Sequence, residues 1–94
     1  MGGTDSNDDA PVTLALDQDE AVVLFDFLAR VLDDRNGSEL REVVAHDGEL
    51  WALTRLWGYL ERSLSAPFRP DYGAVVDAAR QRLVEHSGTW PWNV

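Results

Sequence analysis

Two histidines are the only imidazoles in this chain of 94 residues, and forty positions separate His46 from His86. Asp47 and Glu49 follow His46, but no second nitrogen ligand lies at helical spacing, so a zinc site is incomplete. The hydroxyl side chains have no nearby histidine to act as a base, which leaves a hydrolase triad incomplete as well. The chain has no cysteine and no glycine-rich phosphate loop. We therefore expect a protein with no catalytic residues, no metal and no cofactor.

The carboxylates that stand out lie in the first third of the sequence. Asp19, Asp26 and Asp33 are spaced by seven residues, which places them along one stripe of a helix. Arg30 follows Asp26 by four residues and forms a favourable pair with it. Asp33 and Asp34 lie at the carboxyl end of that helix, where the macrodipole repels anions. An unfavourable placement of charge that nothing nearby compensates indicates function. We therefore expect this stripe to face the cations of a partner, with Asp19 and Asp33 free. The alternative is an acidic face that only keeps the protein soluble.

An aromatic residue and a cation share the polar side of the second expected helix. Trp51 and Arg55 are four residues apart and could stack as a cation–π pair. Exposed Trp and Arg together are typical of interface hot spots. The alternative is that the carboxyl-terminal segment or residues 40–45 cover Trp51. That terminal segment carries Trp90 and Trp92, which we expect either to fold back on the helices or to be buried in a subunit contact.

The charge balance narrows the range of partners. Seventeen Asp and Glu face eight Arg, for a net charge of −9. Such a charge argues against binding to nucleic acids or anionic membranes, whose phosphates would repel the chain. No apolar run approaches 18 residues, and the acidic amino terminus lacks the positive charge of a signal peptide. We expect a cytoplasmic protein whose partner is another protein.

Three amphipathic segments must position these residues. Asp17 and Glu20 form a capping box for a helix to about residue 34, which is apolar on so many sides that it should be central. Asp47 is a candidate N-cap for a helix to about residue 65, and Asp71 caps a third helix that ends at Gly88. The pattern predicts a mainly α fold, a three-helix bundle. Its expected core is Phe25, Leu28, Leu53, Trp57, Leu60, Tyr72, Val76, Ala79 and Leu83.

Two predictions concern the residues before the first helix. Residues 1–11 have no large apolar side chain after Met1, which predicts a disordered acidic tail and leaves residues 12–94 as a single helical domain. Residues 12–16 alternate apolar and small side chains, the pattern of a short β-strand. A lone strand needs a partner, which is either residues 40–45, themselves a strand or a helical turn, or a second copy of the chain in a homodimer.

Residues 67–83 read PFRPDYGAVVDAARQRL. They resemble the carboxyl-terminal half of small, acidic, mostly uncharacterised bacterial proteins with the pattern P-F-x-P-x-Y-x-x-L-L-x-x-A-x-x-R-L. Residues 19–33 resemble the first helix of that group. Within residues 67–83, Val75 and Val76 stand where leucine is usual. The more particular agreements are Phe68, Pro70, Tyr72 and Leu83. The size and charge of these proteins are similar to those of toxin-immunity proteins, which implies an inhibitor-like function and supplies no catalytic residue.

These observations predict a non-catalytic interaction protein, inhibitor-like or immunity-like, that binds a basic protein partner through an acidic helix face. The expected partner-binding residues are Asp19, Asp26, Asp33, Asp34, Trp51 and Arg55. The alternative is a homo-oligomeric structural or accessory subunit that uses Trp51 and the terminal tryptophans. A small enzyme is the third hypothesis.

Overall fold

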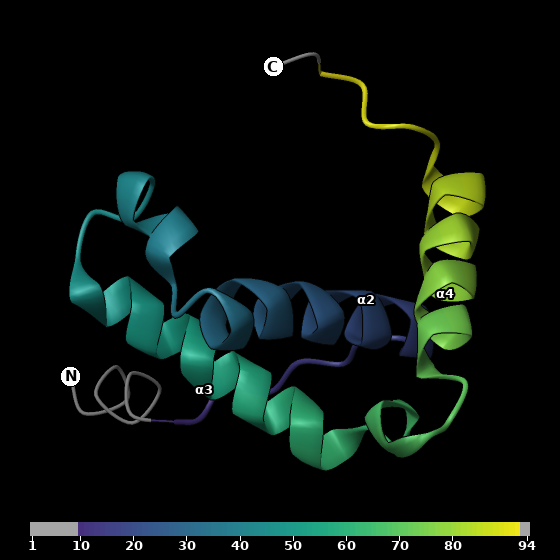
Figure 1. Cartoon of the computed structure of the whole chain (residues 1–94), viewed down its shortest axis with the longest axis horizontal. Coiled ribbons are helices and arrows are strands. Elements are labelled where there is room, and N and C mark those ends of the chain that lie inside the picture. Colours follow the sequence, from purple (N-terminus) through teal and green to yellow (C-terminus); the bar gives the residue numbers. More distant parts are fainter. Residues whose placement is uncertain (1–9, 93–94) are drawn as a thin grey trace, which may run out of the picture.

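The computed structural model describes residues 10–92, and all regular structure in that range is helical (Figure 1). The elements in chain order are α2 (Gln18–Leu28), the π-helical turn η1 (Ala29–Asp34), the 3₁₀ turn η2 (Ser38–Glu42), α3 (Asp47–Ser63), the 3₁₀ turn η3 (Ala66–Phe68) and α4 (Tyr72–Ser87). The mainly α prediction and its three helices are confirmed. The predicted disordered tail, residues 1–11, lies outside the described residues apart from its last two.

Helix α2 begins as the sequence predicts. The Asp17 carboxylate accepts a hydrogen bond of 2.8 Å from the Glu20 N–H, and the Glu20 carboxylate accepts one of 3.0 Å from the Asp17 N–H. Both bonds satisfy backbone donors that the first helical turn leaves without partners. The helical path continues through η1 to Asp34, the expected end, although its last six residues are wound as a π-helix.

The starts of the other two helices differ in detail from the predictions. His46, not Asp47, is the N-cap of α3, and its Nδ1 accepts a hydrogen bond of 2.9 Å from the Gly48 N–H. Asp71 precedes α4 as expected, but its carboxylate binds the Arg69 guanidinium and makes no capping hydrogen bond. These ion-pair hydrogen bonds hold the Asp71 pKa below its ordinary value. Gly88 ends α4 with a φ of 89°, a left-handed conformation that favours glycine.

Helix α2 is the central helix, and both α3 and α4 pack against it (Figure 1). In this view α4 stands steeply across one end of α2, while α3 runs beneath α2 along its length. Leu28 is 1% exposed and is the most deeply buried large side chain of the core. Of the nine predicted core residues, five are buried and three more pack half-buried against them. Leu83 is half-buried and lies outside that cluster.

The strand predicted for residues 12–16 is not formed in the described structure. The segment is extended but has no regular hydrogen bonding. The backbone of its proposed partner, residues 40–45, already forms hydrogen bonds within that segment. The N–H groups of Val43 and Val44 both donate to the Leu40 carbonyl. That segment therefore cannot supply a strand within the chain.

Candidate functional site

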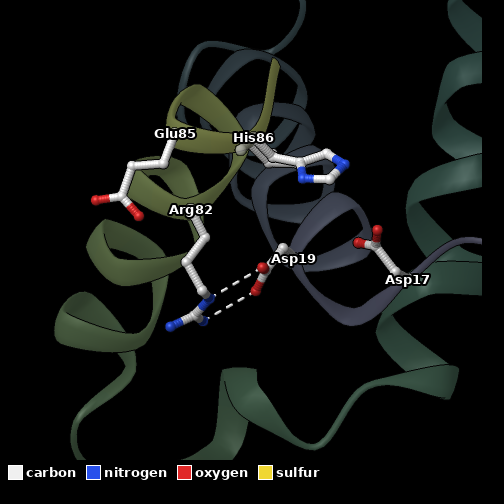
Figure 2. Close-up of a pocket in the computed structure, with 6 residues that line it drawn as sticks. Asp17, Asp19, Arg82, Glu85 and His86 are labelled. Atoms are coloured by element: carbon white, nitrogen blue, oxygen red, sulfur yellow. Dashed lines mark hydrogen bonds and ion pairs between the residues drawn. The ribbon is translucent and has the colours of Figure 1, made fainter. Parts of the chain in front are cut away.

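The two histidines lie in separate parts of the structure. Within residues 10–92 no three His, Asp or Glu side chains come together in a group that could hold a metal ion. The His46 imidazole is used as a helix cap. His86 lines an open hollow of about 440 Å³ between α4 and the start of α2. Figure 2 shows His86 and Asp17 on one side of that hollow and Glu85 on the other.

Two of the residues that line this hollow form an ion pair. Arg82 of α4 donates two hydrogen bonds of 2.9 Å each to the two carboxylate oxygens of Asp19 (Figure 2). These bonds hold the Asp19 pKa below its ordinary value and raise the pKa of Arg82. The expectation that Asp19 is free for a partner is therefore wrong in this structure. Its partner lies 63 residues along the chain, beyond the reach of any helical spacing rule.

Asp26 is engaged more completely than Asp19. The Tyr72 hydroxyl donates to one carboxylate oxygen at 2.9 Å, and Arg80 donates to the other at 2.9 Å. The expected Arg30 pair is also present, at 3.3 Å. Burial, aided by the neighbouring carboxylate, raises the pKa of Tyr72, so the phenol stays a donor. Sequence reasoning missed these α4 partners, because they lie 46 and 54 residues from Asp26 along the chain.

Asp33 and Asp34 differ from the other two acids of the stripe. Both are exposed in η1, and neither has a hydrogen bond or ion pair to another described residue. They occupy the carboxyl end of the α2–η1 helical path, where the backbone carbonyls repel an anion. Of the predicted stripe, these two carboxylates remain available to a partner.

The backbone around these carboxylates departs from ordinary helix. After the π-helical turn, Asn36 has a φ of 53°, which is uncommon for a residue with a side chain. Gly37 follows with a φ of 72°, and its N–H closes the helix end with a hydrogen bond of 2.8 Å to the Val31 carbonyl. A π-helical turn and a left-handed asparagine often mark functional sites.

Trp51 lies beside the same helix end. Together with Leu32 and Leu50 it lines a hollow of about 350 Å³, and the indole is 66% exposed. Within the described residues, neither the carboxyl-terminal segment nor residues 40–45 covers Trp51. The remaining lining residues are Asn36, Gly37, Arg41, Asp47 and Thr54. Arg41 and Asp47 form an ion pair of 3.0 Å at the edge of this hollow.

Arg55 is exposed one turn after Trp51, but the expected cation–π stack is not among the contacts of the described residues. Arg62 lies instead 5.3 Å from the centroid of Tyr59, on the same outer side of α3. Among the described residues no cation–π contact involves Trp51, which stays 66% exposed.

The terminal tryptophans do not fold back on the helices. Trp90 and Trp92 are both exposed and contact each other edge to face, with ring centroids 4.8 Å apart. Figure 1 shows the segment leaving α4 and running away from the other helices. The first of the two predictions for these residues is wrong, and burial in a subunit contact stays a prediction.

A groove without charged side chains separates the amino-terminal segment from α3. It has a volume of about 500 Å³, and residues from 12–16, α2 and α3 line it without a single charged side chain. Tyr59, Leu60 and Leu64 of α3 form one wall.

No helix of the described chain is long and apolar enough to cross a membrane.

Comparison with protein-family models, with curated proteins and with solved structures finds no match to this chain.

Proposed function

We propose that this protein is a non-catalytic interaction protein of the cytoplasm, inhibitor-like or immunity-like, which binds a basic protein partner. The observation that carries the proposal is the juxtaposition at the end of α2. Trp51 is two-thirds exposed beside a hollow of mixed polar and apolar lining, and Asp33 and Asp34, which have no ion pair within residues 10–92, follow directly after the hollow-lining Leu32.

Each part of this surface has a binding role. A tryptophan that can be desolvated against a partner is a common hot spot, because it removes a large apolar area from water at a small entropic cost. Two carboxylates next to it attract cations and raise the association rate. Arg55, one turn further along α3, supplies hydrogen-bond donors at the rim.

The proposal changes the role of the other two acids. Asp19 and Asp26 bind the guanidinium groups of α4, so they fix α4 on α2 and meet no partner directly. The net charge of −9 still favours a basic partner at long range, whichever carboxylates touch it.

Affinity capture from the native host with matched variants tests this surface. We expect a basic protein to be captured by the wild type and by Phe68→Ala, which removes an exposed aromatic ring in η3, and to be lost with Trp51→Ala. With that protein purified, Asp33→Asn combined with Asp34→Asn should slow association and flatten its dependence on salt. Retention by Trp51→Ala, with an unchanged association rate in the double variant, would refute the proposal.

A homo-oligomeric accessory subunit is the second candidate, favoured by Trp90 and Trp92, which are exposed and contact each other edge to face. Two indoles in water expose a large apolar area, which a subunit contact would cover. Replacement of both by Ala should then dissociate the oligomer and leave capture of a basic partner unchanged.

A further inference from the structure

The amino-terminal segment presents alternating apolar side chains on an extended backbone. Val12, Leu14 and Leu16 are 87%, 72% and 40% exposed. Because alternate residues of a β-strand point to the same side, strand pairing would present these three as one apolar row. All three line the groove against α3, whose lining has no charged side chain.

The backbone of this segment is also unpaired. Within residues 10–92 none of the N–H or C=O groups of residues 12–16 has a hydrogen-bond partner. Such a row of free donors and acceptors is what the edge strand of a sheet offers to an incoming strand. Residues 40–45 do not supply that strand, because the N–H groups of Val43 and Val44 donate to the Leu40 carbonyl and the Ala45 N–H donates to the Glu49 carboxylate.

We propose that residues 12–16 pair antiparallel with the same residues of a second copy, so that the protein forms a homodimer. With the two-fold axis at Leu14, Leu14 lies opposite its own symmetry mate and Val12 lies opposite Leu16. Thr13 then lies opposite Ala15, so large side chains meet large ones and small meet small. The segment is complementary to itself, which selects a second copy over a different protein.

The ends of the segment limit the pairing to these residues. In this register Pro11 lies opposite Asp17. Pro11 has no N–H, and the Asp17 N–H already donates to the Glu20 carboxylate at 3.0 Å. When Leu14 forms the hydrogen-bonded central pair, neither Pro11 nor Asp17 has to donate across the interface.

The salt dependence of dimerisation distinguishes it from the binding of a basic partner in the proposed function. Residues 10–16 are uncharged, but Asp8 and Asp9 precede them and Asp17 follows. Two copies of a chain with a charge of −9 repel each other, so salt should strengthen the dimer. Salt should weaken the binding of a basic partner. The dimer does not depend on the Trp51 surface, and Trp51→Ala should leave it intact.

Sedimentation of the full chain across concentration and salt tests the association. We expect a monomer–dimer equilibrium at micromolar concentration that shifts towards dimer as salt is raised. Leu14→Asp, which places two carboxylates opposite each other at the axis, should weaken the dimer by roughly 30-fold or more. Val43→Asp, the same charge change at an exposed site in the turn after η2, should have a much smaller effect. A wild type that stays monomeric at high micromolar concentration, or equal effects of the two variants, would overturn the proposal.

Cysteine cross-linking tests the register, since the chain has no cysteine of its own. Leu14 lies opposite itself, with a Cα separation of about 5.5 Å in a hydrogen-bonded antiparallel pair, within the range of a disulfide. Leu14→Cys should therefore form a covalent dimer under mild oxidation. Thr13→Cys is the matched control, because Thr13 lies opposite Ala15, and it should cross-link at least about 10-fold more slowly. Equal cross-linking rates, or faster cross-linking of Thr13→Cys, would refute this pairing.

Discussion

The Tyr72 hydroxyl of α4 donates a hydrogen bond of 2.9 Å to the Asp26 carboxylate of α2, across 46 residues of sequence. Arg80 and Arg30 bind the other oxygen of the same carboxylate, whose side chain is only 16% exposed. Asp26 is thus the polar centre of the contact between the two helices.

Removal of this carboxylate should destabilise the fold. Asp26→Ala leaves a half-buried hydroxyl and two guanidinium groups without their acceptor, and we expect a loss of about 1–3 kcal/mol. Asp33→Ala is the matched control, since that carboxylate has no ion pair within residues 10–92, and it should stay within about 0.5 kcal/mol of the wild type. Urea unfolding followed by circular dichroism measures both. Equal losses would contradict the different roles assigned to these two acids.

The core prediction concerns Leu28. Because this side chain, the last of α2, is fully buried in the core, Leu28→Ala should lower the free energy of unfolding by about 2–5 kcal/mol. Val43→Ala removes apolar atoms from an exposed site and should cost less than about 0.5 kcal/mol. Thermal or urea unfolding of the two variants, carried out in parallel, measures both losses of free energy. A larger loss for Val43→Ala would mean that α2 is not the central helix.

The Asp19–Arg82 pair predicts an acid dependence of stability. The pKa of Asp19 is lowered in the folded chain by the Arg82 hydrogen bonds. Its contribution is therefore fully present above the ordinary Asp value, about 4, and is lost as the pH falls through the lower folded pKa. In Arg82→Gln, NMR titration of the Asp19 side chain should show its pKa returning towards the ordinary value. An unchanged pKa in that variant would argue that the pair does not form in solution.

Fluorescence quenching distinguishes the four tryptophans. Trp57 packs half-buried against the core, whereas Trp90 is exposed at the end of the chain. A variant that keeps only Trp57, with Phe at the other three positions, should be quenched by acrylamide less readily than one that keeps only Trp90. If Trp90 is protected at low protein concentration, the terminal segment folds back on its own helices after all.

Local sequence signals predicted the helices well and the pairing of side chains poorly. The capping box at Asp17 and the left-handed Gly88 are contacts and conformations within one helical turn, so the sequence is sufficient to find them. The Arg30–Asp26 pair, at i and i+4, was found for the same reason. The predicted cap at Asp47 was one residue away from the true cap, because the histidine before it can also accept a hydrogen bond through Nδ1.

The role of the candidate site residues stays a prediction. Trp51, Arg55, Asp33 and Asp34 are exposed, whereas Asp19 and Asp26 of the same predicted set bind guanidinium groups of α4. The hollow beside Trp51 could not be predicted, since it depends on how η1 and the following turn approach α3. The strand at residues 12–16 was predicted from a correct alternation of side chains, but a strand also needs a partner backbone, which the pattern of one segment cannot supply.

The sequence by itself determined, to within about two residues, where the three helical segments begin and end, which faces are apolar and that the excess negative charge lies in the first third. Those properties depend on residue type and on interactions within about four positions of the chain. The tertiary structure decided which carboxylates are free. Asp19 and Asp33 have the same chemistry and the same heptad position, yet only Asp19 meets a guanidinium, because α4 crosses the start of α2 and does not reach its end. That difference depends on how two helices cross, and no spacing within either helix contains it.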